Sequence, residues 1–152
     1  MKKLIATIIC MALMATFPVC AAPAVECFEG QPIEDLNMED VRLLAAVIWA
    51  EAEGEDHTGK RLVAATVLNR VDDERFPNTI FDVINQPGQF TVVGNGRLYT
   101  GYEKQDPSCV QAAMEELMSR TDRNVLFFCA YGYGYGTPYM KHGNHYFSTL
   151  WR

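Results

Sequence analysis

An apolar run at residues 41–49 is the feature that most constrains the fold of this chain. Asn37 supplies an N-cap residue before the run, and Asp40 supplies an acid in the first turn. Gly54 follows the run and favours the end of a helix. The sequence therefore predicts a helix from Met38 to Ala52 that packs an apolar stripe against a core.

Capping residues and apolar side chains at intervals of three and four predict three more helices. The second helix is capped by Thr58 and continues to Arg70, and the third covers Thr79 to Ile84. Asp106 is a suitable N-cap for a helix that begins with proline and runs over 107–120. Helices therefore make up most of the expected fold.

The remaining regular structure is expected to be β. Gln89–Val93 and Arg97–Tyr99 are β-prone runs separated by a Gly-Asn-Gly segment, which is typical of a hairpin. A buried strand is expected at Val125–Tyr131 and a short last strand at His145–Ser148, with a Gly- and Tyr-rich loop at Gly132–Pro138 before the latter. The pattern predicts one α+β domain, mainly helical with a small β-hairpin or sheet element.

The N-terminus has the pattern of a secretory signal peptide. Two lysines precede an apolar run from Leu4 to Val19, and small residues favour cleavage after Ala21. The run is shorter than the roughly 20 residues of a membrane span, so no stable membrane insertion is expected after cleavage. We expect a signal peptide at 1–21, a short leader at 22–36, a domain at 37–152, and a secreted or cell-envelope protein.

The chain is acidic, with 13 basic and 19 acidic side chains and a net charge of −6. Loss of the signal peptide removes two lysines and no acid, which changes the net charge to −8. Nucleic-acid binding depends on cations that neutralise phosphates, so this class of partner is disfavoured.

Three of the five cysteines remain after removal of the signal peptide: Cys27, Cys109 and Cys129. In an oxidising compartment they can supply one disulfide and one unpaired thiol, and the sequence does not choose the pair. They lie too far apart along the chain for a zinc knuckle.

Glu51 is the strongest candidate for a catalytic residue. It lies seven residues after Leu44 and four after Val47, so it continues the stripe that faces the core. A carboxyl group at the end of a buried stripe is partly desolvated, which raises its pKa and suits it to donate a proton. The alternative is that the helix ends here and Glu51 turns into solvent.

Three further acids, Glu53, Glu55 and Asp56, crowd the same turn. Glu55 lies four residues after Glu51, so the two carboxylates would be neighbours if the helix continued past Gly54. Neighbouring carboxylates push one pKa upwards, as sugar hydrolases often require. The alternative is an acidic loop exposed to water.

No metal site and no cofactor are expected. The segment from His142 to His145 resembles metal-ligand spacing only loosely and lacks an obvious third ligand. A cysteine nucleophile with His145 as base would define a different class of enzyme, but burial or a disulfide explains the cysteines better.

Aromatic and amide side chains are numerous enough to line a sugar-binding cleft. About half of the aromatic residues must be ordinary core in a domain of this size. The candidates for stacking are Phe90, Tyr99, Tyr102, Tyr131, Tyr133, Tyr135 and Tyr139, and the amides are Asn69, Gln89 and Asn144.

Five ordered blocks closely resemble the SleB type of cell wall hydrolases, the spore-cortex-lytic enzymes. The resemblance extends over about residues 41–150. The blocks are Leu44–Glu55, Val63–Val71, Phe76–Ile80, Gln86–Thr91 and Gly143–Phe147.

The resemblance implies a lysozyme-like fold that acts on peptidoglycan, with Glu51 as the catalytic glutamate. The family commonly has Arg where this chain has Glu53, so the local charge differs. A lytic transglycosylase would use Glu51 first as acid and then as base to cut the bond between muramic acid and N-acetylglucosamine.

Five further residues are expected to bind the substrate. Gln89 and Phe90 would position a sugar beside Glu51, while Asn144 and His145 would support the cleft. Glu55 is the candidate second carboxylate that a hydrolase would need. The expected partner is a peptidoglycan glycan strand.

Two other functions stay open at this point: a non-catalytic glycan-binding protein of the same fold, and a metal- or cysteine-dependent amidase. The wall-binding module that often precedes the family's catalytic domain is not in this sequence, so targeting to the wall is expected to come from the domain itself or from a partner protein. The sequence does not decide between spore cortex, cleaved during germination, and vegetative wall.

Overall fold

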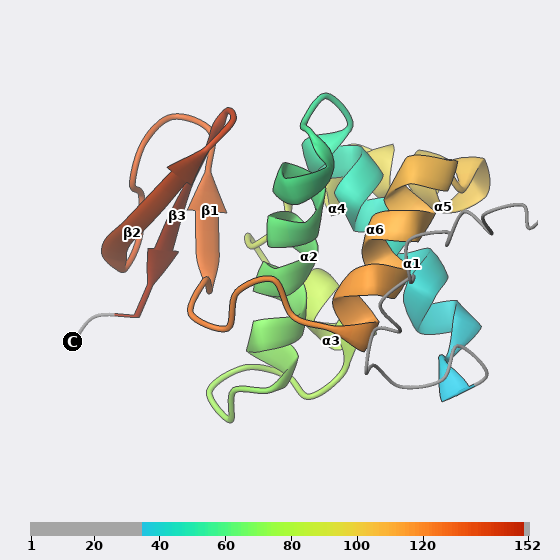
Figure 1. Cartoon of the computed structure of the whole chain (residues 1–152), viewed down its shortest axis with the longest axis horizontal. Helices are drawn as coiled ribbons and strands as arrows, with labels where there is room; N and C mark the ends of the chain where they lie inside the picture. The colour runs from blue at the N-terminus through green and yellow to red at the C-terminus, as the bar shows by residue number, and fades with distance from the viewer. Residues whose placement is uncertain (1–34, 151–152) are drawn as a thin grey trace, which may run out of the picture.

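The computed structural model describes residues 35–150, in which helices form one side of the molecule and a small sheet forms the other (Figure 1). The expected signal peptide and nearly all of the expected leader lie outside the described residues. The elements are α1 Met38–Ala52, α2 His57–Val71, α3 Ile80–Ile84, α4 Thr91–Gly94, α5 Arg97–Lys104, α6 Pro107–Met118, β1 Phe127–Cys129, β2 Thr137–His142 and β3 His145–Thr149.

Helix α1 is the centre of the helical side. Every residue from Leu44 to Ala50 is buried, and α2, α5 and α6 all pack against the helix. The approach of α5 is close enough to require a glycine, because a Cβ at Gly101 would lie 2.7 Å from the carbonyl oxygen of Ala46. A helix that is apolar on nearly every side is stable only when neighbours enclose it.

All four predicted helices have the expected ends to within two residues. Helix α1 has the predicted bounds, with the Asn37 side chain accepting a hydrogen bond from the Glu39 amide. Thr79 is the N-cap of α3, and Asp106 is the N-cap of α6, which ends at Met118 rather than at 120. Short polar side chains that satisfy the first amides define these helix starts.

The N-cap predicted for the second helix is wrong. Asp56, not Thr58, precedes α2, and its carboxylate accepts a hydrogen bond of 2.7 Å from the Gly59 amide. Both residue types are favourable N-caps, so sequence alone does not separate two candidates two positions apart.

The hairpin predicted across Gly94-Asn95-Gly96 is also wrong, because this stretch forms α4 and α5. A two-residue hairpin of the Asn-Gly type needs positive φ at both central residues, but Asn95 has φ −100° and only Gly96 is positive, at 78°. Gly96 is instead the N-cap of α5, and the Asn95 side chain accepts a hydrogen bond from the Arg97 amide. The positive φ therefore separates two helices.

The sheet has three antiparallel strands in the order β1-β3-β2. The predicted first strand is shortened to Phe127–Cys129, and the predicted last strand is present as β3. Strand β2 was not predicted, and it begins at Thr137, inside the expected loop. It is an edge strand with an irregular register around Pro138 and no apolar alternation to reveal it. The predicted fold class, mainly helical with a small sheet, is confirmed.

Buried polar contacts join the sheet side to α2. The Asn69 side chain donates hydrogen bonds of 2.8 Å to the carbonyl oxygens of Asp122 and Val125. Arg70 Nε donates to the Leu126 carbonyl oxygen at 2.7 Å. Asn69 was a candidate for binding sugar, but it is buried and its amide nitrogen is already used by the backbone, so its role is structural.

The cysteines within residues 35–150 do not pair with each other. Cys109 is buried on α6 and Cys129 is partly buried at the end of β1, and both are thiols. A bridge between these two is therefore excluded, and Cys27 lies outside the described residues. Among the described helices, none combines the length and apolar character needed to span a bilayer.

A fully buried carboxylate fastens α6 to α2. Glu116 accepts hydrogen bonds from Arg61 Nε at 3.0 Å, and from the Thr121 amide and hydroxyl at 2.6 Å. Its neighbour Glu115 is partly exposed and bonds to His57 and Gln111 on the surface. A buried charge with several donors is costly to disrupt, since removal of one partner leaves the others unpaired.

We expect Glu116→Ala to lower the free energy of unfolding by about 3–5 kcal/mol, because it leaves the Arg61 guanidinium without its buried partner. The matched surface change, Glu115→Ala, should cost less than about 1 kcal/mol. Urea denaturation of the two variants measures the difference. Equal losses would contradict the structural role of Glu116.

Candidate active site

Glu51 lies at the end of the buried helix, one residue before the last residue of α1. Its side chain is half-buried, because α1 emerges from its neighbours at this point. Within residues 35–150, no side chain or amide forms a hydrogen bond or ion pair with its carboxylate. A carboxyl group that is partly desolvated and has no bonded partner is available to a ligand.

Burial raises the pKa of Glu51 above its ordinary value of 4.5, and the positive charge of Arg97 opposes this effect. Arg97 is held beside the helix end, where its Nε donates to the Ala50 carbonyl oxygen at 3.1 Å and its guanidinium lies 5.1 Å from the Trp49 ring centroid. A cation at the C-terminal end of a helix is also favourable to the helix dipole. The net result is a carboxyl group that keeps its proton to higher pH than an exposed glutamate does.

The other acids of this turn point to separate partners. Exposed Glu53 bonds to Lys104 at 3.2 Å and lies 3.8 Å from Arg97. Asp56 caps α2 and bonds to His142, and these hydrogen bonds lower its pKa. The carboxylates of Glu53 and Asp56 are therefore held by specific partners, and the turn is not an acidic loop surrounded only by water.

Glu55 does not continue the helix of Glu51, because α1 ends at Ala52. Its carboxylate accepts hydrogen bonds from the Asn144 side chain at 2.8 Å and from the Asn144 amide at 3.3 Å. Gly143 has φ +53°, and a Cβ there would overlap the Glu55 carboxylate. The structure thus brings Glu55 and Asn144 together where the turn between β2 and β3 meets the connection between α1 and α2.

His145 follows this turn and is buried. Its ring packs edge-on against Phe128 at 5.2 Å and Phe147 at 6.0 Å between centroids. Burial lowers its pKa, and the nearby charge of Glu55 opposes that effect. His145 is therefore neutral at pH 7, and it is part of the aromatic packing next to Asn144.

Phe90 and Gln89 differ in burial: Phe90 is buried and Gln89 is exposed. Phe90 is 5 % exposed, and its ring centroid is 6.2 Å from that of Phe128. The ring is therefore packed inside the protein and offers no free face for stacking on a sugar. Gln89 is exposed and lines a cavity between α2 and the sheet. Of the two adjacent residues, only Gln89 has a side chain accessible to a ligand.

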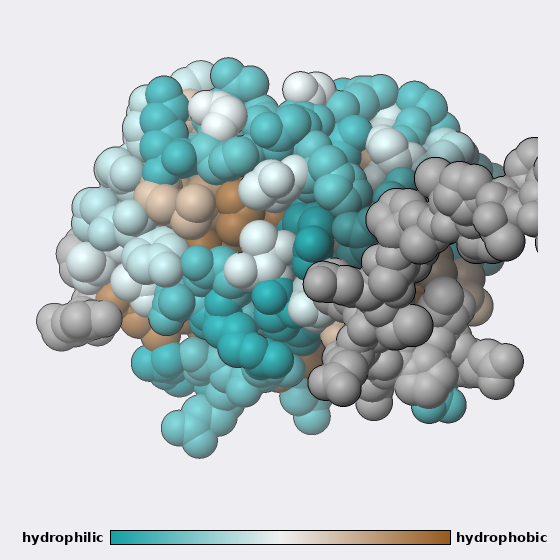
Figure 2. Space-filling view, viewed as in Figure 1, coloured by the Kyte–Doolittle hydropathy of each residue, from teal (hydrophilic) through white to brown (hydrophobic). Residues whose placement is uncertain are grey.

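That cavity has a volume of about 680 Å³. It is lined by the end of α2, the segment 86–89 and one face of the sheet. Figure 2 shows apolar atoms reaching the surface where the sheet meets α2, framed by polar side chains. Glu51 does not line this cavity, but the aromatic contacts from Phe90 through Phe128 to His145 lead from it towards the turn that holds Glu55.

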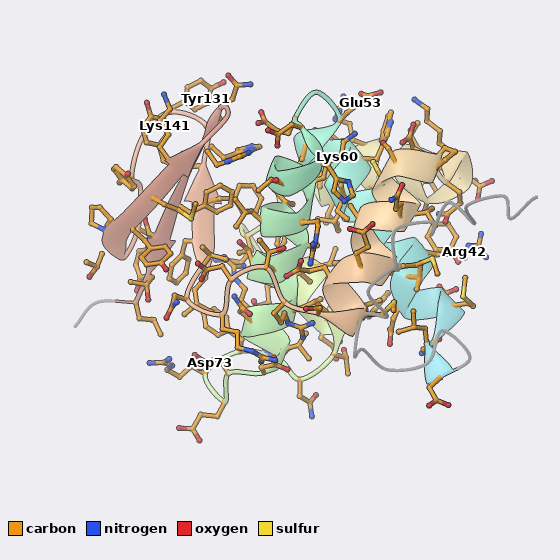
Figure 3. All side chains as sticks on the ribbon, in the orientation of Figure 1. Arg42, Glu53, Lys60, Asp73, Tyr131 and Lys141 are labelled. Atoms are coloured by element: carbon orange, nitrogen blue, oxygen red, sulfur yellow. The ribbon has the colours of Figure 1, made fainter. Side chains whose placement is uncertain are left out.

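The tyrosine candidates separate into two groups. Tyr102 is occupied on α5, where its hydroxyl donates to Glu39 and Arg42 lies over its ring. Tyr131 is 98 % exposed, and Figure 3 shows it at the same end of the molecule as Glu53, with Asp73 at the opposite end. Tyr133 and Tyr135 are also exposed in the loop before β2. Tyr99 on α5 and Tyr139 on β2 are exposed as well, so the exposed tyrosine candidates come from more than one element.

The described residues offer neither a metal site nor a reactive buried thiol. No group of three His, Cys, Asp or Glu side chains between 35 and 150 is arranged to hold a metal ion. Burial raises the pKa of the Cys109 thiol to about 11, which keeps it protonated and unreactive at neutral pH.

Sequence reasoning missed Arg70 as a candidate site residue. Arg70 lines the cavity from α2 although it is almost fully buried. Its spacing, four residues after Thr66 and three after Val67, places it on the buried stripe of that helix. A charged residue on an apolar stripe is the signal that could have identified it.

The pattern of the Cell Wall Hydrolase family matches residues 54–148, and the chain belongs to this family. Glu51 lies just before the matched segment, whereas Glu55, Gln89, Asn144 and His145 lie inside it.

Curated relatives include two spore cortex-lytic enzymes. The one from Bacillus cereus is 41 % identical over 63 residues, which is 41 % of this chain and 24 % of that protein. The one from Bacillus subtilis strain 168 is 43 % identical over 60 residues, which is 40 % of this chain and 20 % of that protein. The chain therefore matches less than a quarter of the length of these relatives.

Two solved structures share the fold over most of this chain. The catalytic domain of the germination-specific lytic transglycosylase SleB from Bacillus anthracis superposes with a TM-score of 0.64 at 26 % identity, covering 76 % of this chain and 98 % of that one. The catalytic domain of Bacillus cereus SleB gives a TM-score of 0.58 at 28 % identity, covering 74 % and 91 %. The chain is thus homologous to SleB enzymes, as the sequence blocks indicated.

We expect Glu51→Gln to raise the melting temperature at pH 7 and to change it little at pH 4. Because its pKa is raised, folded Glu51 binds its proton more tightly than the unfolded chain does, so stability falls as the pH rises above 4.5. Glutamine has the same shape and no charge to bury. Thermal unfolding followed by circular dichroism at both pH values measures the effect, and a lower melting temperature of the variant at pH 7 would contradict it.

Proposed function

We propose that this protein is a peptidoglycan-cleaving glycosidase, a lytic transglycosylase that cuts the bond between muramic acid and N-acetylglucosamine. The observation that carries the proposal is the half-buried, unpaired carboxyl group of Glu51, whose pKa is raised by burial. A glycosidase needs a carboxylic acid that is still protonated near neutral pH. Membership of the cell wall family and the SleB fold supply the substrate class.

In the proposed reaction, protonated Glu51 donates its proton to the glycosidic oxygen as the bond at C1 of muramic acid breaks. The resulting Glu51 carboxylate then removes the proton from the 6-hydroxyl of the same sugar, and that oxygen bonds to C1. Glu51 ends protonated, as it began, and no water is consumed. The products are a free 4-hydroxyl on N-acetylglucosamine and a 1,6-anhydro muramic acid end.

A single carboxyl group is enough for this route, whereas direct hydrolysis generally employs a pair. The candidate second carboxylate, Glu55, is bonded to Asn144. That bond favours a positioning role for Glu55, in which it holds the turn between β2 and β3 against the start of α2. We therefore favour transglycosylation over hydrolysis.

The other expected substrate-binding residues differ in role: Gln89 would contact the sugar, and the others would shape or align the site. Gln89 would donate or accept a hydrogen bond from its exposed position. Phe90 and His145 would shape the side of the binding site from within the protein, because both are buried. Asn144 would align the turn that borders the site, and the cell-wall substrate agrees with export by the expected signal peptide.

The proposal is tested by digesting purified vegetative peptidoglycan and purified spore cortex with the wild type, with Glu51→Gln and with Glu103→Gln. Glu103 is a matched control because it is exposed on α5 and makes no hydrogen bond to a described residue. We expect muropeptides lighter by one water than reducing ones, formed by the wild type and by Glu103→Gln. Glu51→Gln should be at least about 100-fold slower.

Other products would identify other functions. Reducing ends would mean hydrolysis, and released stem peptides would mean an amidase. Binding of glycan without any product, in a wild type that is folded by circular dichroism, would mean a non-catalytic glycan-binding protein. Each of these results would contradict the proposed transglycosylase.

A second prediction concerns the pH dependence of cleavage. Arg97→Gln removes the positive charge that lowers the pKa of Glu51, so the acid should stay protonated to higher pH. The alkaline limb of the profile of kcat/KM against pH should therefore move upwards. Lys104→Gln is the control, since Lys104 bonds to Glu53 and lies over Trp49. A downward shift in Arg97→Gln would contradict Glu51 as the acid.

A further inference from the structure

We propose that the cavity between α2 and the sheet binds the peptide stem of peptidoglycan, with a stem carboxylate paired to Arg70. This inference rests on the proposed function, because it assigns a second recognition site for the same polymer. It starts from a buried cation that lacks an anion.

Arg70 is only 4 % exposed, yet no carboxylate of the described residues pairs with it. Its Nε is used by the Leu126 carbonyl oxygen, and its Nη1 is buried without any hydrogen-bond partner. Its Nη2 also forms no hydrogen bond within residues 35–150, and the residue lines the cavity. Two adjacent N–H groups of one guanidinium are the arrangement that binds a carboxylate with two parallel hydrogen bonds.

Three aromatic rings surround the Arg70 guanidinium. Phe76, Phe90 and Phe127 have centroids 5.4, 5.4 and 5.2 Å from its central carbon. Desolvation lowers the Arg70 pKa to about 10, so the group is still charged at neutral pH. Ring faces offset part of the cost of burying a cation, and an incoming anion would offset more.

The other cation at the cavity does not fill this role. Arg75 is exposed, and its guanidinium is already bonded to the Asp73 carboxylate in a short ion pair. That pair is neutral overall. Arg70 is therefore the cation of the cavity that has no carboxylate partner among the described residues, and a ligand could supply that carboxylate.

Gln86 adds a second unmet requirement. Gln86 lines the same cavity, and its Oε1 is buried without a donor among the described residues. A ligand that satisfies both residues carries a carboxylate and, beside it, an N–H group. Phe127, Phe128 and Tyr146 line the same space and provide apolar walls. A carboxylate, an amide N–H and a small apolar side chain together describe the end of a short peptide.

The position and size of the cavity fit a stem better than the sugar carboxyl alone. About 680 Å³ is far more than one carboxylate needs and is within the usual range for a small ligand. Glu51 does not line the cavity. This agrees with a peptide stem as the ligand, because the stem branches from the glycan strand and does not include the glycosidic bond that is cleaved. Gln89 lines it, and its neighbour Phe90 contacts Arg70, so the cavity adjoins the expected sugar-binding residues.

The binding test uses the free stem tetrapeptide and the same peptide with every carboxyl group amidated, measured by isothermal titration calorimetry with the whole mature protein. We expect the acid form to bind at least ten-fold more tightly than the amidated form. Gln86→Leu should weaken the acid form at least ten-fold, and the matched surface change Gln111→Leu should leave it unchanged. Arg70→Lys keeps the positive charge but removes the two adjacent N–H groups of the guanidinium. It is measured as a second variant after its fold is checked.

The activity test compares glycan strands that carry stems with strands from which an amidase has removed them. We expect the ratio of kcat/KM for the two substrates to favour stems in the wild type and to fall at least ten-fold in Gln86→Leu. Equal binding of the acid and amidated peptides, or equal use of both substrates, would overturn the stem site. Continued cleavage in that case would leave the proposed function intact. Peptide binding without cleavage of either substrate would sustain the stem site and reject the glycosidase.

Discussion

The enclosure of α1 by α2, α5 and α6 is the constraint on which the rest of the structure depends. A helix whose residues from Leu44 to Ala50 are all buried has to be covered on every side before it is stable. The tight approach of α5 at Gly101 completes that cover and brings Arg97 to the end of the helix. The same enclosure ends at Glu51, so the carboxyl group lies at the boundary between core and solvent.

The buried polar groups divide into those that are satisfied and those that are not. Glu116 has donors for both oxygens, and the Asn69 amide nitrogen has two carbonyl acceptors. These groups hold α2, α6 and the start of the sheet together. Arg70 and Gln86 each have a buried side-chain atom without a partner, and both residues line one cavity. Trp49, Arg120 and His145 also have unpaired buried atoms but do not line the cavity, so it is the placement of two such residues on one cavity that points to a recognition site.

Local chemistry in the sequence was enough to predict most helices. Asn37, Thr79 and Asp106 cap helices where their neighbours continue an apolar spacing, and the core-facing position of Glu51 follows from the same spacing. The pairing of Glu55 with Asn144 was not predictable, because it joins residues far apart in the chain across a sheet turn. The expected neighbourhood of Glu51 and Glu55 depended on a helix that in fact ends at Ala52.

The errors in the β region have a shared cause. The Asn-Gly pair at 95–96 allows either a hairpin or a break between helices, and packing of α5 on α1 decides between them. Strand β2 carries few apolar residues and is defined by its pairing with β3. Arg70 was placed on a helix correctly, but its unpaired atoms become visible only when the sheet and segment 86–89 close around it.

The most direct test of the catalytic role assigned to Glu51 is a titration of its side-chain carboxyl carbon by ¹³C NMR, with the resonance assigned by its loss in Glu51→Gln. We expect a midpoint above the ordinary value of 4.5, with a further upward shift on removal of the Arg97 charge. We also expect the midpoint to coincide with the alkaline limb of the kcat/KM profile. A midpoint at or below 4.5 would mean that Glu51 is ionised at working pH and cannot be the acid.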